Sequence, residues 1–118
     1  MAVTTAGLTE SIYLWGNEST PIEFAYIAFG TGTNTATIAD SSLQTELDRK
    51  AISTTTRSGQ EVTFEVIIPS TEQDGESITE YGLLNAASSG TLFTRDVFSA
   101  INKTLNFDIQ IDITLRVK

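Results

Sequence analysis

The chain has 118 residues, of which 40% are hydrophobic, and its 15 acidic and 7 basic residues give a net charge of −8. This length and composition are typical of one globular domain that buries its own core. The absence of cysteine and histidine excludes disulfide bonds, the usual zinc site and any Ser-His-Asp or Cys-His catalytic group, and the acidic charge argues against nucleic-acid binding.

The N-terminal segment from Thr5 to Trp15 predicts a short helix. Leu8, Ile12 and Trp15 recur at the spacing of one helix face, and Gly16 follows where a C-terminal glycine is expected. The segment has no basic start and no long apolar run, so a signal peptide is not expected. The longest apolar run of the chain is also far short of a membrane span.

Short apolar or alternating segments predict six strands, over residues 24–29, 51–57, 61–68, 78–85, 91–98 and 105–117. The second and third should form one hairpin, and the fourth and fifth another. The last segment alternates strictly between apolar and polar residues and predicts a single long strand with one buried face. We expect its apolar row to face the row from Val62 to Ile68. If its partner strands are shorter, one end would overhang them and meet a neighbouring subunit.

Polar segments join these strands. Residues 30–37 form a loop of small residues, and Asp40 or Ser41 is expected to begin a helical turn that buries Leu43 and Leu47. Residues 69–77 form an acidic loop, and residues 99–103 a short link. Together the segments predict one domain over residues 1–118, an all-β antiparallel sandwich of jelly-roll-like form with a short N-terminal helix.

Three motifs invite comparison with chemical sites. The loop from Gly30 to Thr33 lacks the lysine of a Walker loop and the third glycine of a dinucleotide fingerprint, so a tight turn is favoured. The acidic run from Glu72 to Glu76 lacks the EF-hand spacing; a solvated turn is favoured, and a weak surface calcium site stays open. Asp108 and Asp112 would lie about 13 Å apart on one strand, farther than a glycosidase pair. No catalytic residue, cofactor or metal site is therefore expected.

The order of several motifs carries a resemblance to a known family. Residues 26–33 (YIAFGTGT) and 42–50 (SLQTELDRK) are followed by residues 78–85 (ITEYGLLN) and 90–98 (GTLFTRDVF), then by Lys103-Thr104 and the closing alternating segment. In this order they resemble small tailed-bacteriophage proteins that occur alone in the virion or as the leading domain of tail-fibre and tail-collar proteins. The resemblance runs from about Thr5 to the C-terminus, and it implies a structural virion protein without catalytic residues.

The resemblance leaves two functions open, and a third comes from a different class. A head decoration or cement protein that bridges capsid subunits is favoured, because the chain ends where fibre proteins continue into a shaft. A tail-fibre, collar or baseplate adaptor is the alternative, and a glycan-binding sandwich is the third. The expected partners are phage capsid or tail proteins and further copies of the chain in a dimer or trimer, without nucleic acid or membrane. The expected location is the exterior of the virion, after synthesis in the host cytoplasm.

Contact residues are expected in the long polar loops and in the N-terminal segment, because these lie outside the predicted core. The residues favoured for an interface are Trp15, Thr31, Asn34, Thr35, Glu72, Asp74 and Glu76.

Overall fold

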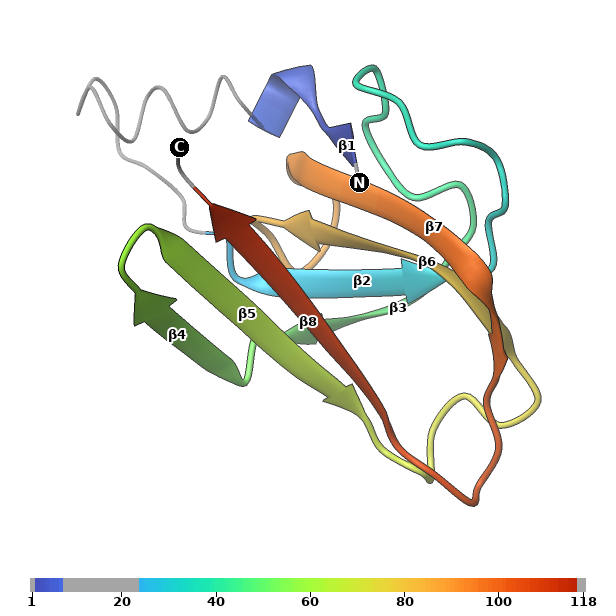
Figure 1. The fold of residues 1–118 in the computed structure, drawn as a ribbon. Coiled ribbons are helices and arrows are strands. Elements are labelled where there is room, and N and C mark those ends of the chain that lie inside the picture. Colours follow the sequence, from blue (N-terminus) through green and yellow to red (C-terminus); the bar gives the residue numbers. More distant parts are fainter. Residues whose placement is uncertain (1, 8–23, 117–118) are drawn as a thin grey trace.

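Two antiparallel sheets form the protein, for which a computed structural model describes residues 2–7 and 24–116 (Figure 1). The five-stranded sheet has the order β1 (Ala2–Val3), β7 (Leu92–Asn102), β6 (Ser77–Leu84), β2 (Tyr26–Gly30) and β3 (Glu46–Ala51). The three-stranded sheet has the order β4 (Thr54–Ser58), β5 (Glu61–Ile68) and β8 (Ile109–Arg116). Residues 5–7 are helical. The predicted all-β sandwich with a short N-terminal helix is confirmed, and most of the predicted helix lies outside the described residues.

The core lies between the two sheets. Strand β2 lies between β6 and β3 in its sheet, and Ile27, Ala28 and Phe29 are fully buried, as its continuous apolar run predicts. Buried side chains from both sheets form the main cluster: Ile27, Phe29, Val66, Ile68, Ile78, Leu83, Ile109, Ile111 and Ile113. A smaller cluster, of Ala28, Leu43, Leu84 and Leu92, lies on the outer face of the five-stranded sheet, because successive residues of β2 point to opposite faces.

The region after the first loop differs from its prediction. Leu43 is buried, but Leu47 belongs to β3 rather than to a helical turn. The predicted strand over 51–57 corresponds mainly to β4, and only its first residue, Ala51, belongs to β3 in the other sheet. The charged sequence of β3 has no strong strand propensity of its own. Pairing with β2 over five residue pairs overrides this local preference. The two predicted hairpins, β4–β5 and β6–β7, are confirmed.

The prediction of a final strand over 105–117 is too long at its start. Strand β7 continues to Asn102, through most of the predicted link, and β8 begins at Ile109. The chain therefore turns between them, and Leu105 and Phe107 are exposed despite the unbroken alternation. Alternation alone does not distinguish a strand from a turn that precedes it.

Strand β8 meets the expected segment, β5, but lies beside it in the same sheet and not opposite it across the core. It pairs with β5 residue for residue, from Glu61 opposite Arg116 to Ile68 opposite Ile109. The apolar row of β5 therefore lies beside that of β8 in one sheet, and both rows face the five-stranded sheet. Because the two strands match in length, β8 does not overhang β5.

Candidate interaction surface

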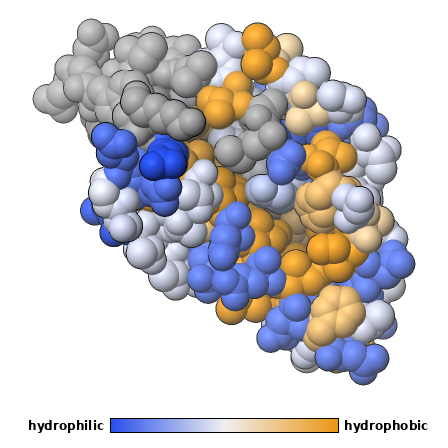
Figure 2. Space-filling view, viewed as in Figure 1, coloured by the Kyte–Doolittle hydropathy of each residue, from blue (hydrophilic) through white to orange (hydrophobic). Residues whose placement is uncertain are grey.

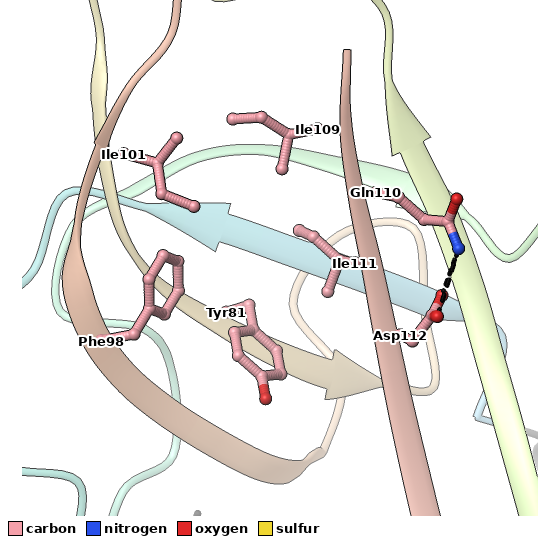
Figure 3. Close-up of a pocket in the computed structure, with 7 residues that line it drawn as sticks. All are labelled: Tyr81, Phe98, Ile101, Ile109, Gln110, Ile111 and Asp112. Atoms are coloured by element: carbon pink, nitrogen blue, oxygen red, sulfur yellow. Dashed lines mark hydrogen bonds between the residues drawn. The ribbon is translucent and has the colours of Figure 1, made fainter.

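An apolar hollow opens where β7 and β8 diverge at one side of the sandwich. It has a volume of about 190 Å³ and is lined by Tyr81, Phe98, Ile101, Ile109, Gln110, Ile111 and Asp112. Figure 3 shows the aromatic rings and the isoleucines turned toward one another, with Gln110 and Asp112 on the other side of β8. In Figure 2, apolar surface runs through the middle of this face toward the lower right, between polar margins. The hollow thus exposes part of the main core to its surroundings.

Strand edges without a partner border the hollow. Among the described residues, β1 pairs with β7 only at Thr94 and Arg95, and no described strand pairs with β7 from Val97 to Asn102 on that side. Strand β8 has β5 on one side and no described strand on the other. Unpaired edges present free backbone donors and acceptors, which makes them sites for pairing with another chain.

Tyr81 forms the polar rim of the hollow. Its ring lies 5.7 Å from that of Phe98, and its hydroxyl donates to Asp96 Oδ2 at 3.2 Å. Burial and the neighbouring Asp96 charge raise the pKa of Tyr81 to about 12. The phenol therefore stays protonated at neutral pH and serves as a hydrogen-bond donor, not as a base.

A buried ion pair, Glu80–Arg95, lies on the outer face of the five-stranded sheet, beneath the loop that joins β2 and β3. Glu80 is fully buried, and Arg95 Nε donates to its Oε1 at 2.9 Å. Arg95 also donates to Asp40 Oδ2 at 3.1 Å and to Asn34 Oδ1 at 2.6 Å. The pair therefore ties β6 and β7 to two points of one loop.

Hydrogen-bond donors saturate the Glu80 carboxylate. Besides Arg95, the backbone N–H of Gln44 donates to Oε1 at 2.9 Å, and those of Gly32 and Thr45 donate to Oε2 at 2.7 and 2.8 Å. A carboxylate offers about four lone-pair sites, and four donors occupy them. This group is suited to holding the loop in place, and it has no lone pair left to take a substrate proton or bind a cation.

Gly30 and Gly32 are required because the loop packs closely against Thr45 and Glu80. A Cβ on Gly30 would lie 2.0 Å from the carbonyl oxygen of Thr45, and a Cβ on Gly32 would lie 2.4 Å from Glu80 Oε2. The Gly32 N–H is directed at this carboxylate, so it is not available to a phosphate. The sequence Gly-Thr-Gly-Thr here brings the chain close to its own returning segment.

The predicted contact residues of this loop are partly engaged within the chain. Thr31 is half-buried, and Asn34 gives both its carbonyl and its side-chain oxygen to Arg95. Thr35 is exposed. Trp15 lies outside the described residues.

The second predicted contact loop joins β5 to β6, far from the first in Figure 1. Glu72 forms a 2.6 Å ion pair with Lys50, and the Glu76 carbonyl accepts the backbone N–H of Lys103 at 2.8 Å. Asp74 is exposed. Among the described residues, no three acidic, histidine or cysteine side chains gather as they would around a metal ion. The structure therefore does not bring the predicted contact residues together into one surface.

Lys103 is a buried cation that the sequence did not single out. It is 1% exposed, and its Nζ donates to the carbonyl oxygens of Ser70 and Thr104 at 3.1 and 2.7 Å. The Phe107 ring lies over it, 5.5 Å from Nζ to the ring centroid. Lys103 fixes the turn that leads from β7 into β8, and its own sequence neighbourhood gives no sign of this burial.

The Glu80 network predicts a loss of stability in acid. Burial alone would raise the pKa of Glu80, but donation by Thr45, Gln44, Arg95 and Gly32 lowers it below the ordinary value of 4.5. A carboxyl whose pKa is lower in the folded state stabilises the fold above its unfolded pKa. This contribution disappears as the pH falls through the folded pKa.

We therefore expect the free energy of unfolding to fall below about pH 4.5, and to fall less steeply in Glu80→Gln. Urea denaturation from pH 3 to pH 7 measures both slopes. The variant Glu61→Gln, at a half-exposed position, serves as control and should retain the wild-type slope. Equal acid slopes in wild type and Glu80→Gln would contradict this account.

Comparison with models of protein families found no match, and comparison with curated proteins found none either. In the part of the chain that the structure describes, there is no helix with the length and apolarity needed to cross a membrane.

Proposed function

We propose that this protein is a non-enzymatic structural component of a bacteriophage particle, carried on the outside of the head as a decoration or cement protein. The observation that carries the proposal is the open side of the sandwich, where an apolar hollow lies between two unpaired strand edges. A surface of this kind suits docking to another protein chain. The choice of a bacteriophage particle rests on the sequence resemblance to small virion proteins.

Two further features support a docking role over catalysis. Among the described residues, Glu80 has the most buried carboxylate, and donors from the chain itself saturate it. The net charge of −8 favours solubility and suits a basic surface on a shell subunit. Further copies of the chain and capsid subunits are the proposed partners.

The test compares particles assembled with and without this protein. Heads that lack it should lose DNA at a lower temperature and after milder osmotic shock, and supplying the wild-type chain in trans should restore them. Heads of unchanged stability whose particles fail to attach to the host would overturn the head assignment and favour the tail adaptor. Unchanged heads and attachment, with binding to a glycan array, would favour the glycan-binding sandwich.

A further inference from the structure

Among the edge strands of the described sheets, β8 carries a long apolar row without protection. The edge strand β1 has two residues. The edge strand β3 is rich in charged residues, and the residues of β4 are all exposed and mainly threonine. Strand β8 has eight residues in strict alternation, and Ile109, Ile111 and Ile113 are buried. Charged or short edges resist pairing with another chain, and a long alternating edge favours it.

We propose that β8 pairs antiparallel with β8 of a second copy of this chain, about a two-fold axis that passes at Thr114. The two three-stranded sheets would then form one continuous six-stranded sheet. This proposal goes beyond the virion function and does not depend on it, because it follows from the edge alone.

Symmetry restricts how two β8 strands can pair. An antiparallel pair related by a two-fold axis keeps the inner faces of both sheets on one side, and residues directly opposite each other share a face. The axis must therefore pass at a residue, so that apolar residues meet apolar residues. A shift of the axis by one residue changes which side chains of the polar row are opposite each other.

Charge selects the register. An axis at Asp112 would place two aspartates opposite each other, and like charges in this position destabilise a sheet. An axis at Thr114 places Asp112 opposite the partner's Arg116, twice by symmetry, and Ile113 opposite the partner's Leu115. An axis at Ile111 or Ile113 sets Asp112 against neutral Gln110 or Thr114. The register at Thr114 is thus the one of these that pairs opposite charges.

Both charged groups are accessible for this pairing. Asp112 is exposed and is bonded to Gln110 of its own strand. The Arg116 side chain is 60% exposed, at 3.6 Å from Glu61, and exposed pairs of this kind contribute little. If Arg116 turns from Glu61 to the partner's Asp112, the monomer therefore loses little stability.

The same placement satisfies part of the unpaired edge. In this register, residues 112–116 of one copy lie opposite residues 116–112 of the other, and the added strand supplies backbone hydrogen bonds along this stretch. Ile109 and Ile111, which line the hollow, lie outside this stretch. A second copy therefore provides a partner for the C-terminal part of the β8 edge.

A cysteine scan tests the axis directly, because the natural chain contains no cysteine. Thr114→Cys places two thiols opposite each other at the axis, with Cβ atoms about 4.5–5.5 Å apart. We expect rapid cross-linking to a dimer under mild oxidation at micromolar concentration. Thr56→Cys, on the opposite edge of the same sheet, is the matched control and should remain mainly monomeric.

A charge exchange tests the register. Asp112→Arg and Arg116→Asp should each weaken dimerisation about tenfold, because each replaces two attractive pairs with two repulsive ones. The double variant should recover the wild-type dissociation constant, measured by sedimentation equilibrium. A monomer at every concentration, cross-linking of Thr56→Cys as fast as of Thr114→Cys, or no recovery in the double variant would overturn the proposal. None of these outcomes bears on the location of the protein in a virion, which imaging reads separately.

Discussion

Glu80→Gln is expected to lower the free energy of unfolding by about 3–5 kcal/mol, among the largest effects of any single substitution in this chain. The glutamine would fit the space, but its amide N–H₂ would point at backbone N–H groups of the loop, which also donate. In addition, Arg95 would stay buried without the Glu80 counter-charge. A buried charge that loses its partner costs far more than an exposed one. Urea denaturation at pH 7 measures the loss.

Glu61→Gln is the matched control. Glu61 faces Arg116 at 3.6 Å, and both side chains are about half-exposed, 43% and 60%. Its loss should cost at most about 1 kcal/mol. If Glu80→Gln also cost less than about 1 kcal/mol, the network would not hold the loop, and the account of this region would be wrong.

Gly30→Ala is expected to destabilise the fold by about 3 kcal/mol or more, at the upper end of the cost of overpacking. The new methyl group would lie 2.0 Å from the Thr45 carbonyl oxygen, which belongs to the backbone of the returning loop. The loop would have to move away from Gly30, and it would strain the Thr45 N–H donation to Glu80. Thermal or urea unfolding of the purified variant measures the effect.

Gly59→Ala separates steric crowding from backbone conformation. Gly59 has a φ of 58° and nothing within 4 Å of its missing Cβ, so alanine there costs about 1–2 kcal/mol through its left-handed backbone alone. We expect Gly30→Ala to cost more, although Gly30 has no positive φ. A larger loss of stability in Gly59→Ala than in Gly30→Ala would show that the loop moves easily away from residue 30 and is not tightly packed.

The strands that could be predicted from the sequence are those whose apolar or alternating pattern lies within the strand itself. The apolar run of β2 and the two hairpins followed from local residues, and the all-β sandwich followed from their number and spacing. The first residue of β8 and the existence of a strand at β3 were missed, because contacts with other segments of the chain determine both. Strand β3 forms against β2 despite its charges, and the turn around Lys103 ends β7 despite the alternation around it.

The Glu80–Arg95 pair can be recognised only when the pairing register of the β6–β7 hairpin is known. Glu80 lies opposite Val97 and Arg95 lies opposite Gly82, so the two charges are diagonal neighbours. An irregularity between Ile78 and Glu80 shifts this register, and it sets which face Glu80 occupies. No feature of a single segment reports such a shift.

The expected contact surface changed for a related reason. Long polar loops are reasonable candidates for contacts in a sequence, but here Asn34 and Glu72 are bonded within the chain. The unpaired edge of β8 has the pattern of a half-buried strand, and only the topology reveals that one side lacks a neighbour. The predicted neighbour contact at an overhanging end is replaced by the proposed contact along this edge.

Imaging whole particles is the most direct test of the proposed function, which assigns this chain to a bacteriophage virion. Electron cryomicroscopy at subnanometre resolution should show a two-sheet density of this size bound to the outside of the head, between neighbouring shell subunits. That density should be absent from particles of a deletion strain. Finding the sandwich at the tail or collar, or finding no difference between the two particles, would contradict the assignment.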